Sequence, residues 1–249
     1  MSKTVIITGG TKGIGAAISQ VFYEAGYHVL IGARNNNGLA SRLGERARFL
    51  KIDVTKEPDH IRLAKTALRW TKRLDVYINN AGFSQWKPIH EFDAVFWDKM
   101  MDTNLKGTMW GCKTAAEYLS TGGVIINISS LAGKRGSANN SAYCASKFGV
   151  TGLTQALAKE LGQQGVRVNA ICPVYVETEG LLRALRDKRS PAKGKSIKIY
   201  FQRFKESQSA LQRLPKGEEV AQTCLFFASD ASSAITGQSL NVDCGVLPS

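Results

Sequence analysis

A tyrosine and a lysine four residues apart, Tyr143 and Lys147, are the pair in this chain best suited to acid/base chemistry. Residues i and i+4 share one face of a helix, so the phenol and the ammonium can point into the same cleft. A free phenol, with a pKa of about 10, is a poor acid or base at neutral pH, but a nearby cation lowers that pKa. We therefore expect Tyr143 to exchange a proton with the oxygen of a carbonyl that accepts a hydride.

Two serines, Ser129 and Ser130, precede this pair at a position that suits substrate binding. The Tyr-x3-Lys spacing alone is a weak signal, since about one chain in two of this composition contains one by chance. The serines, however, directly follow the apolar run at 124–128, which we expect to be a strand. Parallel α/β folds bind ligands at the carboxyl ends of their strands, so a serine there can reach a bound substrate.

A glycine-rich turn near the N-terminus, residues 8–15 (TGGTKGIG), joins an expected strand at 4–8 to an expected helix at 14–25. Glycine lets the backbone turn tightly and approach a pyrophosphate, and the start of a helix offers free N–H groups. The Gly-x3-Gly-x-Gly spacing is a variant of the dinucleotide fingerprint. A turn that only connects two elements is the alternative, but the place between strand and helix favours a nucleotide site.

Two cations lie where the adenosine ribose is expected. Lys12 is inside the glycine turn, and Arg34 follows the expected strand at 28–33. A fold selective for NAD places an acidic residue at the end of that strand, where this chain has Gly32 and Ala33. Two cations without a carboxylate favour the 2′-phosphate of NADP, and two solvated surface cations are the alternative.

Short β-rich runs alternate with helical patterns, which predicts βαβ units around a parallel sheet. We expect strands at 4–8, 28–33, 48–52, 75–78, 124–128, 166–171 and 239–242, and helices at 14–25, 57–71, 141–163 and 218–229, with a long interrupted helical region at 92–119. Runs such as Val5-Ile6-Ile7 are apolar on both faces, as buried parallel strands are. No repeat or linker divides the sequence, so we predict an α/β fold with a single doubly wound, Rossmann-like domain over 1–249 and a parallel seven-stranded sheet.

The positive charge of the chain is concentrated in one segment. The formal net charge is +13, and residues 183–216 hold eleven Lys and Arg residues against only Asp187 and Glu206. These cations could attract an anionic substrate through a carboxylate, phosphate or sulfonate, or they could simply be solvated. A basic nucleic-acid binder is a further alternative, although no nucleic-acid motif accompanies the cations.

The five cysteines are widely spaced and form no CxxC pair. This spacing indicates a reducing compartment and neither a disulfide framework nor a metal site. The first residues lack the pattern of a secretory signal, and no apolar run approaches the ~18–20 residues that span a bilayer. We expect a cytoplasmic protein with no metal and no membrane partner.

Together and in their order, these motifs resemble the short-chain dehydrogenase/reductase family from end to end. The resemblance is carried by Thr8-Gly9-x3-Gly13-x-Gly15, Asp53-Val54, Asn79-Asn80-Ala81-Gly82, Asn104, Ser130 and Tyr143-x3-Lys147. It is similar to NADP-type members such as 3-oxoacyl-carrier-protein reductases and related small-molecule ketoreductases. Two positions depart from the family pattern: Pro173-Val174 replaces Pro-Gly, and Asp243-Cys244-Gly245 replaces Asp-Gly-Gly.

The resemblance implies a role for each catalytic position. Tyr143 donates or takes the proton, and Lys147 lowers the pKa of Tyr143 and binds the nicotinamide ribose. Ser130 hydrogen-bonds the substrate oxygen, whereas we expect Ser129 to face the core. Asn104 opens a helix bulge that holds a water next to the lysine.

The resemblance also implies a set of cofactor-binding residues. Asp53 and Val54 would contact the adenine, Asn80 the ribose region, and Val176 and Thr178 the carboxamide. The full set is Thr8, Gly9, Thr11, Lys12, Gly13, Ile14, Gly15, Arg34, Asp53, Val54, Asn80, Ala81, Gly82, Tyr143, Lys147, Val176 and Thr178.

The basic segment, residues 177–216, occupies the place of the family's helical substrate lid. Its apolar residues could line a substrate pocket or could dock the lid onto the body. They are Leu181, Leu182, Leu185, Ile197, Ile199, Tyr200, Phe201 and Phe204. Phe83 to Trp86, after the fourth expected strand, should also lie near the site.

The sequence therefore predicts an NADP(H)-dependent oxidoreductase that interconverts a ketone and a secondary alcohol, on an anionic small molecule or an acyl-carrier substrate. The family's habit predicts a homotetramer, or a homodimer. A cofactor-sensing regulator on the same fold is the other alternative besides a nucleic-acid binder, and it would be expected to lose a catalytic residue.

Overall fold

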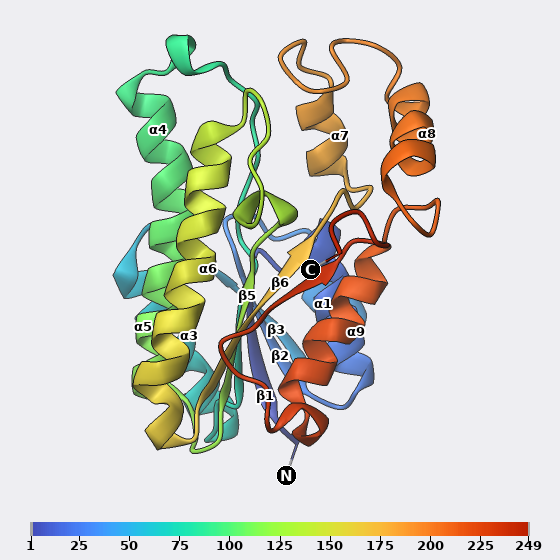
Figure 1. Cartoon of the computed structure of the whole chain (residues 1–249). Coiled ribbons are helices and arrows are strands. Elements are labelled where there is room, and N and C mark those ends of the chain that lie inside the picture. The colour runs from blue at the N-terminus through green and yellow to red at the C-terminus, as the bar shows by residue number, and fades with distance from the viewer. Residues whose placement is uncertain (1, 249) are drawn as a thin grey trace.

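A computed structural model of the chain describes residues 2–248 and has a seven-stranded sheet at its centre (Figure 1). The strand order is β3-β2-β1-β4-β5-β6-β7, and every neighbouring pair is parallel. The strands are β1 (Thr4–Thr8), β2 (His28–Ala33), β3 (Ala47–Lys51), β4 (Val76–Asn79), β5 (Val124–Ile128), β6 (Arg167–Pro173) and β7 (Ser239–Val242). The predicted doubly wound, Rossmann-like α/β fold is confirmed.

Helices cover both faces of this sheet. They are α1 (Gly13–Glu24), α2 (Leu39–Leu43), α3 (Glu57–Thr71), α4 (Ala94–Met101), α5 (Gly107–Tyr118), α6 (Ser141–Leu161), α7 (Glu179–Leu185), α8 (Ile197–Gln208) and α9 (Gly217–Ala228). In Figure 1, α1 and α9 lie on one face and α3, α5 and α6 on the other. No helix within residues 2–248 is both long and apolar enough to span a membrane.

The central strands are apolar on both faces because each face supports its own core. Along β1, Val5 and Ile7 belong to the cluster under α1 and α9, whereas Ile6 belongs to the cluster under α3 and α5. All three side chains are fully buried. Adjacent side chains of a strand point to opposite faces, so a continuous apolar run is what a doubly covered strand requires.

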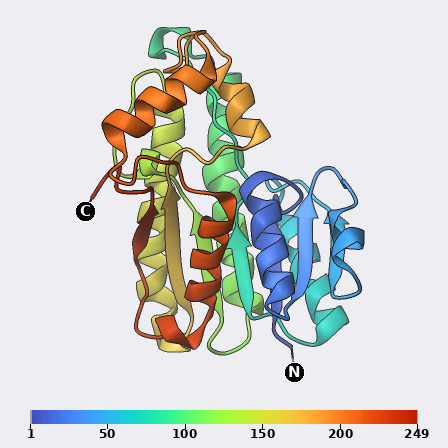
Figure 2. The same cartoon turned by 90° about the vertical axis from the view of Figure 1, so that its right-hand side faces the viewer.

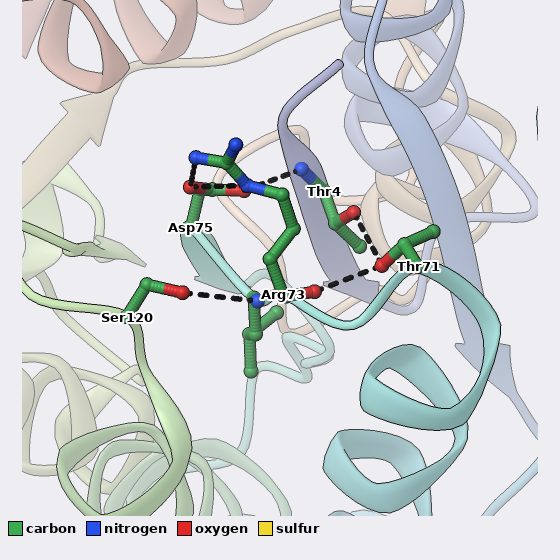
Figure 3. Close-up of polar contacts among 6 residues, drawn as sticks. Thr4, Thr71, Arg73, Asp75 and Ser120 are labelled. Atoms are coloured by element: carbon green, nitrogen blue, oxygen red, sulfur yellow. Dashed lines mark hydrogen bonds and ion pairs between the residues drawn. The ribbon is translucent and has the colours of Figure 1, made fainter. Parts of the chain in front are cut away.

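A polar cluster fixes the amino ends of β1 and β4 (Figure 3). Asp75 Oδ2 accepts a hydrogen bond from the Thr4 amide at 2.7 Å, and the Arg73 guanidinium binds both carboxylate oxygens of Asp75. Thr71 Oγ1 accepts from Thr4 Oγ1 at 2.8 Å and donates to the Arg73 carbonyl oxygen at 2.9 Å. These bonds occupy the amino edge of the sheet, opposite to the edge that carries the candidate site.

The basic segment forms a cap over the carboxyl ends of the strands (Figures 1 and 2). It contains α7 and α8, as expected of a helical lid. Its apolar side chains pack on one another and on the buried Trp86. Of the eight apolar residues considered above, Ile199 is the one outside this cluster, and 53% of its side chain is exposed. This packing supports the alternative in which these apolar residues dock the basic segment onto the body of the protein.

The observed element bounds agree closely with the sequence predictions. The bounds of β1, β2, β5, β7 and α3 are those predicted, and the others shift by one or two residues, as helix and strand ends usually do. The interrupted helical region at 92–119 consists of α4, a π-helical turn at Asp102–Lys106, and α5.

Candidate active site

The four expected catalytic residues meet at the carboxyl edge of the sheet. Ser130 follows β5, Tyr143 and Lys147 lie in the first two turns of α6, and Asn104 lies in the π-helical turn before α5. Ser146 joins two of them, because its Oγ donates to the Tyr143 carbonyl oxygen at 2.7 Å and accepts from Asn104 Nδ2 at 3.3 Å.

Asn104 is held by a pair of backbone hydrogen bonds. Its Oδ1 accepts from the Phe83 amide at 2.9 Å, and its Nδ2 donates to the Phe83 carbonyl oxygen at 2.9 Å. The side chain is fully buried. The helix bulge that the resemblance implies is present as the π-helical turn Asp102–Lys106, a local feature that is frequent at functional sites. Asn104 therefore ties this turn to the loop after β4.

Lys147 is almost completely buried, with 4% of its surface exposed. Its Nζ donates to the Ile128 carbonyl oxygen at 2.8 Å, at the end of β5. A Cβ added to Gly82 would lie 3.7 Å from this Nζ, so the loop after β4 passes close to the ammonium. Burial lowers the pKa of Lys147 to about 8, because the charged form loses hydration.

The Tyr143 phenol is in an apolar environment that includes Phe96 and Ala142. Burial raises the pKa of Tyr143 to about 12, and a hydrogen bond with Ser130 offsets only part of that rise. The lowered phenol pKa expected from the sequence is wrong, because Lys147 Nζ lies 5.7 Å from the ring centroid and burial outweighs its charge. The phenol is therefore protonated at neutral pH and can act as an acid.

The side chains of Ser129 and Ser130 lie in different surroundings. Ser129 is buried and its Oγ donates to the Lys147 carbonyl oxygen at 3.1 Å, so it faces the core as expected. Ser130 caps a short 3-10 turn, where its Oγ accepts from the Ala132 amide at 3.1 Å. Its hydroxyl also meets the Tyr143 phenol, which places both groups where one substrate oxygen can touch them.

The glycine turn has the shape that a pyrophosphate site requires. Gly9 and Gly13 have positive φ values of 66° and 55°, which only glycine adopts without strain. A Cβ added to Gly15 would lie 2.3 Å from the Gly9 carbonyl oxygen. The first backbone bond of α1 runs from Ala16 N to Lys12 O, so within residues 2–248 the preceding N–H groups of that turn are free to bind an anion.

Thr8 and Asn80 join the glycine turn to the loop after β4. Thr8 Oγ1 accepts from the amides of Asn80 and Ala81 at 3.0 and 3.2 Å. Asn80 Nδ2 donates to the carbonyl oxygens of Thr8 and Gly9 at 2.9 and 3.2 Å. Asn80 thus positions the turn, while its contact with the cofactor ribose stays a prediction.

Lys12 and Arg34 are both exposed at the end of the sheet where the adenosine is expected. Neither side chain forms a hydrogen bond or a close ion pair with any residue from 2 to 248. Asn37 Nδ2 donates to the Thr11 carbonyl oxygen at 2.6 Å, which joins the loop after β2 to the glycine turn. Two cations therefore stand beside one loop with no protein anion bound to them.

Asp53 follows β3 on the same side of the sheet. Burial would raise the pKa of Asp53, but hydrogen bonds from Thr55 and the charges of Lys56 and Arg34 hold that pKa below its usual range. The side chain is an ionised acceptor at neutral pH. Val54, the next residue, lies in the same turn.

The loop after β6 crosses the glycine turn. Thr178 caps α7, with its Oγ1 accepting from the Leu181 amide at 3.3 Å, and a Cβ added to Gly13 would lie 3.2 Å from its methyl carbon. Val176 is buried, and Val174, which departs from the family pattern, packs against the cluster of Leu131, Cys172 and Val246. Thr178 therefore lies against the glycine turn, and the contact of Val176 and Thr178 with a cofactor stays a prediction.

Comparison with known proteins fits this geometry. The sequence profile described as Enoyl-(Acyl carrier protein) reductase matches residues 9–247. The 3-oxoacyl-[acyl-carrier-protein] reductase FabG of Chlamydia trachomatis is 33% identical over 255 residues, covering 99% of this chain and 98% of that protein. The cis-4-hydroxycyclohexanecarboxylate dehydrogenase of Sinomonas cyclohexanicum is 34% identical over 251 residues, covering 98% and 96%. An actinorhodin polyketide ketoreductase crystallised with NADPH has a TM-score of 0.91 at 31% identity, covering 98% of this chain and 97% of that one.

The chain belongs to the short-chain dehydrogenase/reductase family. It is an oxidoreductase of the kind that interconverts CH–OH and C=O groups. The tyrosine, lysine, serine and asparagine of this short-chain dehydrogenase/reductase are those described above, and their individual roles stay predictions.

The cations of the basic segment differ in how far they are neutralised. Arg183 pairs with Glu179 at 2.9 Å, Arg189 pairs with Glu91 at 2.6 Å, and Arg213 pairs with Glu219 at 2.7 Å. Among residues 2–248, eight others form no ion pair: Lys205 is half-buried, and seven are exposed, namely Arg186, Lys188, Lys193, Lys195, Lys198, Arg203 and Lys216. These are the cations left to act on a ligand of this short-chain dehydrogenase/reductase.

Three residues of the site region were not singled out by the sequence patterns. Ser146 lies three residues after Tyr143 and faces it, so helix spacing could have identified it. Glu91 pairs with Arg189, and no sequence pattern predicts a contact over such a separation. His60 lies on the apolar face of the predicted helix at 57–71, and that register could have identified it as buried.

Proposed function

We propose that this protein is an NADP(H)-dependent oxidoreductase that interconverts a ketone and a secondary alcohol by hydride transfer, on an anionic small molecule or an acyl-carrier thioester. The proposal rests above all on the partly buried Tyr143 phenol, whose pKa the neighbouring Ser130 hydroxyl lowers in part, at the carboxyl edge of the sheet. Such a phenol supplies a proton where a carbonyl oxygen gains negative charge.

The residues around the glycine turn fit a dinucleotide. The left-handed glycines and the free N–H groups of α1 suit a pyrophosphate. Thr178 lies against Gly13, in the loop after β6 that also carries Val176, and we assign the carboxamide to these two residues. When bound, the nicotinamide supplies or accepts the hydride. In this proposal Lys147 binds the nicotinamide ribose, and Asp53 and Val54 flank the adenine.

Tyr143 and Ser130 act on the substrate oxygen. As the carbonyl carbon gains a hydride, its oxygen becomes basic, and Tyr143 donates the phenolic proton to it. Ser130 donates a hydrogen bond that stabilises the developing charge. The buried Lys147 ammonium favours the phenolate that Tyr143 becomes. Asn104 keeps the π-helical turn in place and holds a water beside the lysine.

The preference for NADP(H) is supported by the charges at the end of β2. Lys12 and Arg34 are exposed and form no ion pair with any residue from 2 to 248, although Arg34 is near enough to Asp53 to lower the pKa of that carboxyl. Gly32-Ala33 stands where a NAD-selective site has a carboxylate. Guanidinium and ammonium groups bind phosphates strongly. The actinorhodin ketoreductase, a structure similar to this one, was crystallised with NADPH.

The anionic character of the substrate is supported by the seven exposed, unpaired cations of the basic segment, which we propose to be the substrate lid. Focused charge of one sign raises the local concentration of an oppositely charged substrate. One similar protein is named as a reductase of an acyl-carrier substrate, and another as a dehydrogenase of a hydroxy compound that carries a carboxylate.

The assembly and the location of the protein are part of the proposal. An apolar hollow between α5 and α6 is lined by Leu105, Met109 and Leu153, and Phe148 is exposed on α6. Such a surface supports a homotetramer or homodimer, which light scattering on the purified protein would test. The five cysteines form no disulfide, which supports a cytoplasmic location.

A carbonyl screen tests the proposed function. Purified protein is incubated with NADPH or NADH and with a panel of neutral and anionic ketones and acyl thioesters, and cofactor oxidation is followed. We expect turnover with NADPH and an anionic member of the panel. Turnover with no carbonyl and no alcohol in either direction would contradict the proposal.

A further inference from the structure

A buried histidine contacts the turn that the proposed function assigns to the adenine. His60 lies on α3, and none of its surface is exposed. Its Nδ1 is 2.8 Å from the Tyr77 hydroxyl, and its Nε2 is 2.9 Å from the Val54 carbonyl oxygen. The residue thus links a core strand, β4, to the irregular segment after β3.

The two contacts determine the tautomer of the imidazole. The Val54 carbonyl oxygen can only accept, so Nε2 carries the ring hydrogen and donates it. Nδ1 is then an acceptor, and the Tyr77 hydroxyl donates to it. Burial lowers the pKa of His60, although the Val54 bond and the nearby Asp59, Asp53 and Glu57 raise it. The neutral ring is therefore fully hydrogen-bonded.

Val54 is also confined from the opposite side. A Cβ added to Gly107, at the start of α5, would lie 3.1 Å from both the Val54 carbonyl oxygen and its Cγ2. Gly107 directly follows the π-helical turn that carries Asn104. Val54 therefore lies between the histidine of α3 and the start of α5.

The turn itself has little regular structure to keep its shape. Residues 52–56 belong to no strand or helix. The Asp53 amide donates to Asp59 Oδ2 at 2.7 Å, and Asp53 Oδ1 accepts from the amide and hydroxyl of Thr55. These polar contacts, the backbone bonds from Lys56 N to Asp53 O and from Ile52 N to Ala33 O, and the His60 bond hold the turn. Of the side chains among them, that of His60 is fully buried.

We propose that His60 is a positioning residue for the adenine half of the cofactor, because its Nε2–H holds the Val54 carbonyl and so fixes the turn that flanks the adenine. The inference rests on the proposed function, since that function places adenine at Asp53 and Val54. It adds a residue that does not itself touch the cofactor.

Two amide variants separate the two ring nitrogens. His60→Gln places its amide near Nε2, where it still donates to Val54, whereas the shorter His60→Asn places its amide near Nδ1 and reaches only Tyr77. Ala67→Gly loosens the same helix two turns beyond His60 and serves as the control. The measured quantities are the dissociation constants of NADPH and adenosine 2′,5′-bisphosphate, and kcat at saturating NADPH.

We expect His60→Asn to weaken both ligands about three- to tenfold, the effect of one lost hydrogen bond, with kcat within about twofold of wild type. His60→Gln should retain most of the affinity, and Ala67→Gly should retain all of it. Unchanged affinity in His60→Asn, or equal losses in all three variants, would overturn the positioning role. A wild-type protein that binds neither NADPH nor NADH would instead overturn the proposed function, and this inference with it.

Discussion

The Lys147 ammonium nitrogen lies 5.7 Å from the centroid of the Tyr143 ring and donates to the Ile128 carbonyl oxygen rather than to the phenol. The two groups share one face of α6, but burial acts on both. It raises the pKa of Tyr143 to about 12 and lowers the pKa of Lys147 to about 8. At neutral pH the phenol therefore keeps its proton, which suits the reduction of a carbonyl.

Oxidation of the alcohol should accelerate as the pH rises. Tyr143 must be deprotonated to take the proton of an alcohol, and the fraction of phenolate beside a charged Lys147 grows about tenfold per pH unit up to about pH 8. Above that pH the oxidation rate should level, because Lys147 loses its charge. Reduction uses the protonated phenol, so it should not gain from alkaline pH, and it should decline above about pH 8 as Lys147 loses its charge. The measurement is kcat/KM in both directions from pH 6 to 10. An oxidation rate that peaks at pH 7 and then falls would contradict the raised phenol pKa.

Replacing Arg34 should reduce the preference for NADPH over NADH. Charge-assisted hydrogen bonds contribute ~1.5–3 kcal/mol each, so the wild-type preference in kcat/KM should be at least about tenfold. Arg34→Ala should lose most of that preference by weakening NADPH alone. Arg42→Ala, which removes a cation from α2 that donates to the Asn37 carbonyl oxygen, is the control. Equal efficiency with the two cofactors in the wild type would refute the assignment.

Salt should weaken the binding of an anionic substrate through the basic segment. Raising the salt concentration to ~0.5 M should increase KM several-fold while kcat changes little, because screening acts on the encounter. The pair Arg186→Ala and Lys198→Ala should flatten this dependence. Lys65→Ala and Lys159→Ala, exposed cations on α3 and α6, are the matched pair and should leave it unchanged. A neutral best substrate with a salt-independent KM would leave the lid charge without a catalytic role.

Cys244→Gly should stabilise the protein. Cys244 has a φ of +56°, and its carbonyl oxygen accepts from the Leu211 amide and from Ser209 Oγ, bonds that glycine would keep. Relief of a left-handed conformation, ~1–2 kcal/mol, exceeds the extra chain entropy of glycine, ~0.5–1 kcal/mol. The free energy of unfolding should therefore rise by roughly 0.5–1 kcal/mol in urea titrations. Cys244→Ala keeps the strained backbone and should give no gain; an equal gain would place the effect in the thiol.

The parts of the fold that depend on local sequence pattern could be predicted from the sequence. A strand such as Val5-Ile6-Ile7 is apolar on both faces wherever helices cover both faces, and the Tyr143–Lys147 spacing places both residues on one side of α6 whatever surrounds them. The direction of the Tyr143 pKa shift could not be predicted from the sequence. It depends on burial against Phe96 and Met100, which lie more than forty residues earlier in the chain and reach Tyr143 only in the tertiary fold.

The sequence also could not predict which cations of the basic segment are neutralised or how its apolar residues pack. Its net charge is visible in the composition, but Arg189 meets Glu91 and Arg213 meets Glu219 only after folding. The apolar residues of α7 and α8 are equally compatible with a pocket and with a small core. Trp86, from the loop after β4, packs in the same cluster, so these residues form a small core.

The central claim is that the Tyr143 phenol donates the proton in a carbonyl reduction, and a single-turnover measurement of Tyr143→Phe tests it most directly. The variant keeps the ring and removes the proton donor, so the rate of NADPH oxidation with a substrate from the carbonyl screen should fall roughly 10²–10⁴-fold. NADPH affinity should stay near that of the wild type, because Lys147 is intact. Tyr118→Phe, at the distal end of α5, should react at the wild-type rate. A Tyr143→Phe protein that binds NADPH and reduces the same substrate at a near-normal rate would contradict the claim.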